Sequence, residues 1–476
     1  MNNRKRVNNI IKEILAELPK VEPKIDKDGN KIKMSILGYT IHIITKSKYK
    51  IIAHAGRIWI YYKGTYIPIE SKARTENFIM ECVKKIDSVL FVTAGIVANI
   101  LNELFMQYYE LFPVENSEIT YINMLSYVLA IDKNGEINIL EHDEKYNFTY
   151  QLPYDYDADA KSPVFDKFLK TSLDDEDLIK AIGEYLGYVL NTNAKNHEKA
   201  LFMYGDGSNG KSTLINIIKY LFGQENISVV ELTEMGDMTK CALMDGKLLN
   251  ISSDAKKNGL DTSAFKKIVS GEPVLGKYLW KDVYTIETLP KLIVAMNKLP
   301  FHNGDNSFGF YRRLLLVPFT VTIQEEDKDY DLESKVIANE LPAILNFAIE
   351  GMRRLTKQGS FTEAKAMKEA MNSYKESANH VATFIEEEQY EAVDPATQTG
   401  TKLVTIYKDF KNWCLERGHN AYSDSYLSSE LSHLGYIGYK NSCKHFRIVK
   451  KKLENETAHK LLNKDLKKTP YETEKK

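Results

Sequence analysis

Cysteine is scarce in this chain of 476 residues, which has only four: Cys82, Cys241, Cys414 and Cys443. No two of them have the spacing of a zinc ribbon or of a redox-active dithiol, so neither kind of site is predicted. Cysteines that lie this far apart are typical of a protein whose thiols stay reduced. We therefore expect free thiols and a cytoplasmic setting.

Long hydrophobic runs are also missing. The longest, such as Leu90 to Val97, are far shorter than the roughly 20 apolar residues that a transmembrane helix needs. The chain begins with a polar, basic stretch and continues with apolar residues at helical spacing from Ile10 to Leu15, a pattern that requires no signal peptide. The sequence predicts a soluble protein without a membrane partner.

Neither sign of charge predominates, because 64 lysines and arginines face 65 aspartates and glutamates, for a formal net charge of −1. This balance excludes a uniformly basic nucleic-acid coat but leaves room for a local basic patch. Residues 440–476 are such a patch, with 12 Lys or Arg against 5 Asp or Glu. This end is the first candidate for contact with a polyanion, and a solubilising tail is the alternative.

The residue pattern predicts a mixed entry region. Hydrophobic residues at 43% and charged residues at 27% are ordinary globular values, and the length predicts two to four domains at roughly 100 to 200 residues each. Residues 35–70 are rich in Ile, Tyr and Thr with glycine turns, which favours β-hairpins. Residues 73–112 and 165–190 are expected to be helical, and a short β segment around 128–140 has Asn134-Gly135 as its turn.

The centre and the C-terminal part have different patterns. Residues 201–319 alternate apolar strands with helices, which is typical of a sheet covered by helices. Residues 333–375 are expected to be helical. Residues 402–452 indicate helix, helix and then β structure, a size and order that suit a winged helix.

The strongest motif is a G-x-x-x-x-G-K-S loop between an apolar strand and an apolar helix. Glycines at this spacing let backbone N–H groups surround phosphates at the positive end of a helix. Lys211 is expected to meet the β- and γ-phosphates of a nucleoside triphosphate, and Ser212 to ligate Mg²⁺. The residues expected to bind the nucleotide are Gly205, Asp206, Gly207, Ser208, Asn209, Gly210, Lys211, Ser212 and Thr213.

Three later segments supply the other groups that such a site needs. The next apolar strand ends at Asp254, the candidate metal ligand. A third strand ends at Asn297, an amide suited to orienting water or reading the γ-phosphate. Arg312 and Arg313 stand just ahead of another apolar strand, where a guanidinium could reach a neighbouring subunit's ATP.

Each of these residues also has a purely structural explanation. Asp254 could cap the following helix, Asn297 could lie in a turn before Pro300, and the two arginines could form a solvated edge. Their order and close spacing after the phosphate loop favour the functional interpretation.

Taken together, the motifs resemble those of the superfamily 3 helicases, a branch of the AAA+ ATPases. Within it, the chain is similar to the helicase portion of phage and plasmid primase-helicases related to the poxvirus primase-helicase. The likeness extends over roughly residues 130–450. The segments that carry it are Gly205–Ser212, Gly246–Asp254, Phe265–Lys281, Lys291–Pro300 and Arg312–Phe319.

The resemblance implies a multidomain α/β protein in which an AAA+ P-loop ATPase core follows an α+β N-terminal region and precedes a C-terminal winged helix. The expected parts are an N-terminal region (1–130), a helical collar (131–195), the ATPase core (196–330), a helical lid (331–392) and a winged helix with a basic tail (393–476).

The resemblance also implies a hexameric ring with ATP at the subunit boundaries. Lys211, Asp254 and Asn297 would then act in cis, with Mg²⁺ held by Ser212 and Asp254, and Arg312 or Arg313 would act in trans. A helix and a hairpin between Asp254 and Asn297 would face DNA in the ring channel. The DNA-binding candidates there are Lys266, Lys267, Lys277 and Lys281, with Tyr278 or Trp280 available to stack. Solvated lysines and core packing of Trp280 are the alternatives.

The function so implied is an ATP-dependent DNA helicase, hydrolysing ATP to ADP and phosphate, for replication of a phage, plasmid or mobile genomic island in a bacterial host cytoplasm. Its expected partners are single-stranded and forked DNA and, as a further candidate, a separate primase or polymerase. The alternatives are a replication initiator or loader that melts an origin without processive unwinding, and a small-molecule kinase.

Two departures from the family pattern matter. Relatives often have a second carboxylate at the strand end, where this chain has Ala255, so the group that activates water is left open. The acidic clusters upstream, Asp155 to Asp159 and Asp174 to Asp177, are expected to be a connector and a helix start. No primase activity is therefore expected of this chain.

Overall fold

The structure is a computed structural model of the chain. Its elements divide into two compact units, Met1–Asn372 and Ser373–Lys476. The residues that it describes are 3–22, 24–29, 31–69, 71–88, 90–108, 118–192, 197–253, 261–278, 283–299, 308–378, 380–394, 399–417, 421, 423–441 and 443–450.

The first unit opens with an α+β region that has its own core. Its elements are α1 (Asn3–Glu17), β1 (Lys24–Ile25), β2 (Lys31–Ile32), α2 (Ile36–Lys46), β3 (Ile51–His54), β4 (Arg57–Tyr62), β5 (Thr65–Pro68), α3 (Lys72–Ile86) and α4 (Ala94–Gln107). Strands β3, β4 and β5 form an antiparallel meander. Buried apolar side chains from this meander and from all four helices make one continuous cluster.

The β prediction for residues 35–70 is wrong at its beginning, because residues 36–46 form helix α2. The Oγ atom of Ser35 caps this helix by accepting a hydrogen bond of 3.0 Å from the N–H group of Gly38. Tyr39 and Ile43 lie one turn apart on its buried face. Burial of that face outweighs the small helix penalty of the β-branched residues. The hairpins predicted after residue 50 are confirmed, with Gly56 and Gly64 at positive φ in their turns.

A second small sheet follows, built from β6 (Thr120–Asn123), β7 (Val128–Ile131) and β8 (Ile137–Leu140). The predicted hairpin at 128–140 is confirmed. The Oδ1 atom of Asp132 accepts hydrogen bonds of 2.9 Å from the N–H groups of Asn134 and Glu136, and Gly135 adopts φ +86°. Strand β6 was not predicted.

The centre of the first unit is a five-stranded sheet whose paired strands are all parallel. Its strand order is β10-β11-β14-β9-β15. The strands are β9 (Ala200–Tyr204), β10 (Ile227–Ser228), β11 (Leu249–Ser253), β14 (Lys291–Met296) and β15 (Leu314–Pro318). This sheet confirms the predicted alternation of strands and helices.

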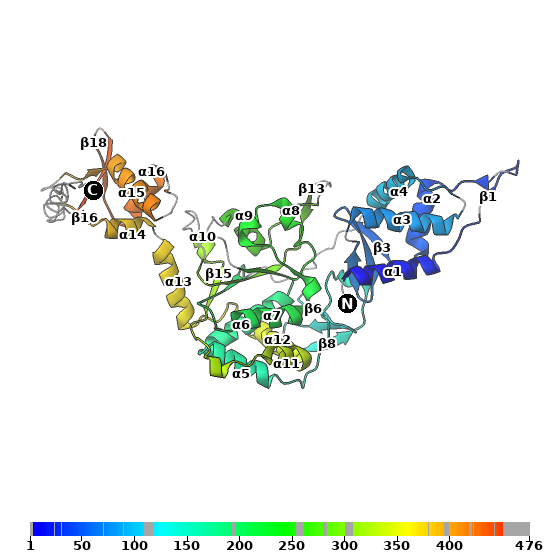
Figure 1. The fold of residues 1–476 in the computed structure, drawn as a ribbon, viewed down its shortest axis with the longest axis horizontal. Coiled ribbons are helices and arrows are strands. Elements are labelled where there is room, and N and C mark those ends of the chain that lie inside the picture. Colours follow the sequence, from blue (N-terminus) through cyan, green and yellow to red (C-terminus); the bar gives the residue numbers. More distant parts are fainter. Residues whose placement is uncertain are drawn as a thin grey trace, which may run out of the picture. The chain divides into compact units, whose positions relative to one another are not determined.

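Helices cover both faces of this sheet (Figure 1). Leu201 and Met203 of β9 belong to the same buried cluster as the helices of one face, whereas Phe202 packs against Phe265 on the other face at 6.0 Å between ring centroids. The first group is α5 (Pro163–Ser172), α6 (Glu176–Leu190), α7 (Lys211–Phe222), α11 (Leu332–Asn339) and α12 (Leu341–Gln358). The second is α8 (Met238–Cys241), α9 (Thr262–Ser270) and α10 (Phe308–Tyr311).

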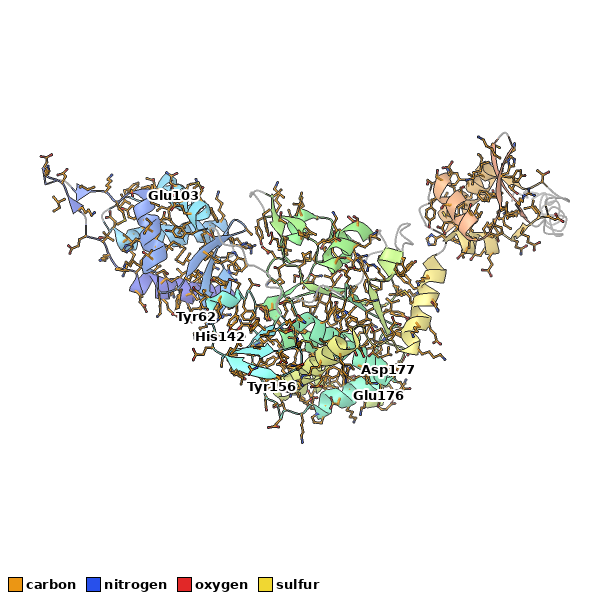
Figure 2. All side chains as sticks on the ribbon, turned by 180° about the vertical axis from the view of Figure 1, so that it is seen from behind. Tyr62, Glu103, His142, Tyr156, Glu176 and Asp177 are labelled. Atoms are coloured by element: carbon orange, nitrogen blue, oxygen red, sulfur yellow. The ribbon has the colours of Figure 1, made fainter. Side chains whose placement is uncertain are left out.

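Helices α6 and α12 approach each other backbone to backbone. A Cβ atom added to Gly351 would lie 2.1 Å from the carbonyl oxygen of Gly183, and one added to Gly187 would lie 2.4 Å from that of Ala348. Glu176 and Asp177 stand in the first turn of α6 (Figure 2), after Asp175, whose Oδ1 atom accepts from the N–H group of Asp177 at 2.8 Å. The acidic run is therefore the start of a helix, as predicted.

The second unit is smaller and packs around aromatic residues. Phe410 and Trp413 are stacked at 6.2 Å, and Phe384 meets Phe410 edge-on at 5.3 Å. The helix, helix, β order predicted after residue 402 is confirmed for the described residues. The elements are α13 (Lys365–Ala378), which enters from the first unit, α14 (His380–Glu387), β16 (Tyr390–Ala392), β17 (Thr401–Lys402), α15 (Leu403–Glu416), α16 (Asp424–His433), β18 (Gly438–Asn441), β19 (Cys443–Phe446) and β20 (Ile448–Lys450).

Across the described ranges, no helix has the length and apolar character needed to cross a bilayer. All four cysteines are free, as predicted. The basic tail beyond residue 450 lies outside the described residues.

Candidate nucleotide-binding site

The G-x-x-x-x-G-K-S segment forms the loop between β9 and α7. Strand β9 lies between β14 and the edge strand β15, so the loop follows a strand that is paired on both sides. The N–H group of Gly205 donates to the carbonyl oxygen of Met296 at 3.3 Å, and that of Ile323 donates to the carbonyl oxygen of Ser208 at 2.8 Å. These bonds tie the loop to the segments around it.

The ammonium group of Lys211 lies inside this loop. Its Nζ atom donates to the carbonyl oxygens of Gly205 and Asp206, at 2.6 and 3.1 Å, and to Oδ1 of Asn209 at 2.9 Å. Lys211 is only 7% exposed, and these acceptors offset the cost of burying its charge. All three are neutral oxygens, so an anion in the loop would compete with them for the ammonium group.

Glycine is required at two loop positions but not at a third. A Cβ atom on Gly205, where φ is +151°, would lie 2.1 Å from the carbonyl oxygen of Phe319. One on Gly210, where φ is +86°, would lie 2.5 Å from Oγ of Ser172. Beside Gly207 there is open space. The loop is thus backed closely by Phe319, just after β15, and by α5, and it is open at Gly207, as a cradle for a phosphate chain must be.

The other predicted groups also follow the carboxyl ends of parallel strands, on the same side of the sheet as the loop. Met296 of β14 is in register with Tyr204 of β9, so Asn297 and Gly205 are the next residues on adjacent strands, which run about 4.8 Å apart. Asn297 is exposed there. Asp254 directly follows β11, but it lies outside the described residues.

One carboxylate on this side of the sheet was missed by the sequence analysis. Glu231 follows β10, and its Oε2 atom accepts a hydrogen bond of 2.7 Å from Oγ of Ser252, near the end of β11. The same Oγ accepts from the N–H group of Leu232 at 3.2 Å. No sequence motif marks Glu231, because its position depends on the pairing of β10 with β11.

The two arginines lie just before the amino end of β15, at the opposite end of the parallel strands from the phosphate loop. Leu314 is in register with Ala200, the first residue of β9, and the two strands are five residues long, about 16 Å. The arginines are therefore far from the loop of their own subunit.

Their side chains differ in exposure. Arg313 is 10% exposed and donates to Oγ of Ser270 from Nε and Nη2, at 3.0 and 2.7 Å. Arg312 is 45% exposed and pairs with Glu198 at 2.5 Å. Of the two guanidinium groups, that of Arg312 is the more accessible.

The helix and hairpin expected between Asp254 and Asn297 are present. Helix α9 is followed by β12 (Val274–Lys277) and β13 (Val283–Ile286), which pair antiparallel. Lys267 and Lys277 are exposed and Lys266 is half-buried. Trp280 and Lys281, which stand between the two strands in the sequence, lie outside the described residues.

Tyr278, next to the tip, is engaged in packing. It stacks on Tyr284 at 5.2 Å, and the guanidinium group of Arg57 lies 3.6 Å from the centre of its ring. The hydroxyl groups of both tyrosines donate to Oδ2 of Asp245, at 3.2 and 3.1 Å. Burial, and then the charge of Asp245, raise the pKa of Tyr278. In this conformation the ring of Tyr278 has a structural role.

No group of three or more His, Cys, Asp or Glu side chains could hold a metal ion within the described part of the chain. Asp155, in the predicted connector, accepts hydrogen bonds from the N–H and Oγ groups of Ser126 at 2.8 and 2.6 Å. Its carboxylate thus fastens the connector to the turn between β6 and β7.

A comparison with protein families matches the region that contains this loop. A family of unknown function, DUF5906, matches residues 203–313, which include the loop, β11, α9 and the hairpin. A protein of Acanthamoeba polyphaga mimivirus named "Putative helicase L207/L206" is 22% identical over 261 residues. That match covers 49% of this chain and 27% of the viral protein, so the chain spans about a quarter of the length of this relative.

Among solved structures, apo forms of the NrS-1 C-terminal region are similar in outline. One has a TM-score of 0.49 at 12% identity and covers 87% of this chain and 99% of its own. Another has a TM-score of 0.47 at 12% identity and covers 88% and 99%.

Proposed function

We propose that the chain is an ATP-dependent DNA helicase of the superfamily 3 type, with an AAA+ P-loop core. The observation that carries the proposal is the position of Lys211, buried in a glycine loop between the carboxyl end of the parallel strand β9 and the start of α7. Loops of this kind bind the phosphates of nucleotides. Similarity to a viral protein named as a helicase supports the reaction class.

The residues at the carboxyl end of the sheet have complementary roles in this proposal. Lys211 exchanges its carbonyl partners for the β- and γ-phosphates, and Asn297 orients water or contacts the γ-phosphate. The exposed hydroxyl of Ser212 and the carboxylate of Asp254 are the proposed ligands of Mg²⁺, which would supply charge neutralisation. Glu231 is our candidate for the group that activates water, since Ala255 offers no carboxylate.

Arg312 is the proposed arginine finger. It lies at the end of the sheet opposite its own loop and its side chain is 45% exposed, so it suits a site on a neighbouring subunit. Both arginines pair with Glu198, but Arg313 also donates twice to Ser270 of its own subunit and is largely buried, which suits a supporting role. This division requires a ring, which we propose to be hexameric.

DNA is proposed to contact the exposed lysines of α9 and of the β12–β13 hairpin in the ring channel. Lys267 and Lys277 are exposed there, and Lys266 and Lys281 complete the set. Contacts of this kind go to phosphates and do not read sequence. The second unit is a proposed winged helix for duplex or fork DNA, and a separate primase or polymerase is a proposed partner in replication.

The test is ATP hydrolysis by the full chain with and without single-stranded DNA, together with separation of a forked duplex. We expect DNA to stimulate hydrolysis and the fork to open. Lys211→Ala should abolish both activities, and Lys72→Gln, on the surface of α3, should change neither. Hydrolysis that DNA does not stimulate, with an intact fork, would reject the motor in favour of an initiator or loader.

A further inference from the structure

A cavity of about 190 Å³ lies in the first unit, where the N-terminal region meets segments that flank the central sheet. Arg6 of α1 and Arg57 of β4 both line it. So do Gln151, Asn226 and Lys247, which come from the segments before α5, after α7 and before β11. We call it the arginine cavity.

The charges in the arginine cavity favour an anion. Three cationic side chains, Arg6, Arg57 and Lys247, face two carboxylates, Glu225 and Asp245. The carboxylate of Asp245 already accepts hydrogen bonds from two tyrosines. Among the described residues, neither arginine has a carboxylate within ion-pair distance.

Arg6 is the most demanding of these groups. Of its five N–H donors, one has an acceptor among the described residues, Oε1 of Gln151 at 3.2 Å. Burial lowers the pKa of Arg6, and the more distant charge of Glu225 opposes that shift. A guanidinium group that has lost water without gaining a close counter-ion is a natural partner for an anion.

The polar wall around Arg6 is held in place. The Nε2 atom of Gln151 donates to the carbonyl oxygens of Lys63, Met124 and Leu125, at 2.8, 3.2 and 3.2 Å, which fixes Oε1 toward Arg6. The carbonyl oxygen of Gln151 accepts from Asn226 at 2.8 Å. Both side chains are buried, at 8% and 4% exposure. The site is therefore organised before any ligand arrives.

We propose that the arginine cavity binds a phosphate group, with Arg6 and Arg57 as its ligands. Guanidinium groups match the geometry of phosphate oxygens and can bind them bidentately. The cavity of about 190 Å³ is more than ten times the roughly 10–15 Å³ of free space that holds one water molecule, so a phosphate group fits. The phosphate can belong to a DNA strand or to a free nucleotide, and the chemistry of recognition is the same.

The experiment measures two probes on the full chain carrying Lys211→Ala, which removes the lysine of the other phosphate site. One probe is a labelled oligothymidylate of about 20 nucleotides, followed by anisotropy at several salt concentrations. The other is thymidine monophosphate, followed by calorimetry. The variants are Arg6→Gln and Arg57→Gln, and the control is Lys72→Gln, whose side chain is 65% exposed and outside the cavity.

We expect Arg6→Gln to weaken the binding of one of the two probes about ten-fold. If a DNA strand supplies the phosphate, the affinity for the oligonucleotide falls and the salt dependence of its binding decreases by about 0.7, whereas the affinity for the mononucleotide is unchanged. If a free nucleotide is the source, the mononucleotide weakens. Should both probes bind folded Arg6→Gln and Arg57→Gln as they bind the control, the cavity is no phosphate site. If one of the two arginine variants fails to fold, the other still tests the proposal.

This proposal does not rest on the helicase assignment. Phosphate binding in the cavity is measured with the two probes on Arg6→Gln and Arg57→Gln, whereas hydrolysis at the loop is measured on Lys211→Ala. A loss of phosphate binding in the cavity and a loss of hydrolysis at the loop are therefore separate observations.

Discussion

At the level of single residues, the phosphate loop is defined by which glycines have room for a side chain. Gly205→Ala would place a methyl group 2.1 Å from the carbonyl oxygen of Phe319 at a φ of +151°, at a strain cost of roughly 1–3 kcal/mol. We expect lost ATP binding and a lower unfolding temperature. Gly207→Ala, with open space around it, should keep both properties. Equal behaviour of the two variants, in calorimetry and thermal unfolding, would contradict the loop geometry.

A second prediction at this level concerns pH. His197 packs edge-on against Tyr188 and Phe361, at 5.7 and 5.5 Å between ring centroids. Burial, and then the charge of Lys291, lower its pKa from the usual 6.5. Below pH 6.5 the unfolded chain takes up the proton more readily than the folded chain, so stability falls as the pH drops through the lowered pKa.

The measurement is denaturant unfolding of the wild type and of His197→Gln between pH 8 and pH 5. The variant should show a shallower loss of stability on acidification, whatever its stability at pH 8. An unchanged slope would show that His197 does not titrate in this range.

The residues of the site differ in how far the sequence could predict them. The glycines and Lys211 are close together along the chain, so their spacing alone predicts the loop. Glu231 reaches the site through a hydrogen bond to Ser252 on another strand, and no local pattern records that contact. The difference in exposure between Arg312 and Arg313 likewise depends on tertiary contacts, because Ser270 packs against the guanidinium group of Arg313 only.

At the level of elements, the contact of α6 with α12 depends on glycine. Gly351→Ala would bring a methyl group to 2.1 Å from the carbonyl oxygen of Gly183, so the helices must separate. We expect a loss of about 1–3 kcal/mol in the free energy of unfolding. Gly95→Ala in α4 is the control, since its nearest neighbour is 3.8 Å away, and it should change stability by less than about 0.5 kcal/mol. Chemical denaturation of the two variants compares them directly.

The elements show the same limit of sequence reasoning. The central parallel sheet could be predicted because its strands are continuous apolar runs between helical segments. Helix α2 could not, because Ile, Tyr and Thr favour strands when no partner is specified. Its Ser35 cap and its buried face decide the outcome, and the second of these depends on α4, which lies about 50 residues later.

At the level of the whole molecule, the positions of Lys211 and Arg312 at opposite ends of the strands of one sheet predict shared active sites. Lys211→Ala and Arg312→Ala should each be inactive alone. Mixing them should restore part of the ATP hydrolysis, because some boundaries then combine an intact loop with an intact finger. Mixing Lys211→Ala with Arg313→Ala tests the other arginine. No recovery in either mixture would favour a site contained within one subunit.

Asp245 links the β12–β13 hairpin to strand β11 of the parallel sheet. It accepts hydrogen bonds from Tyr278 and Tyr284 of the hairpin, and it precedes β11, the strand that ends near the proposed nucleotide site. Strand β11 has five residues and is hydrogen-bonded on both sides, so it resists deformation along its axis. If DNA contacts the hairpin as proposed, a force on the hairpin would pass through Asp245 and β11 to the end of the sheet where the nucleotide is proposed to lie. Tension on the DNA would then set the speed of hydrolysis.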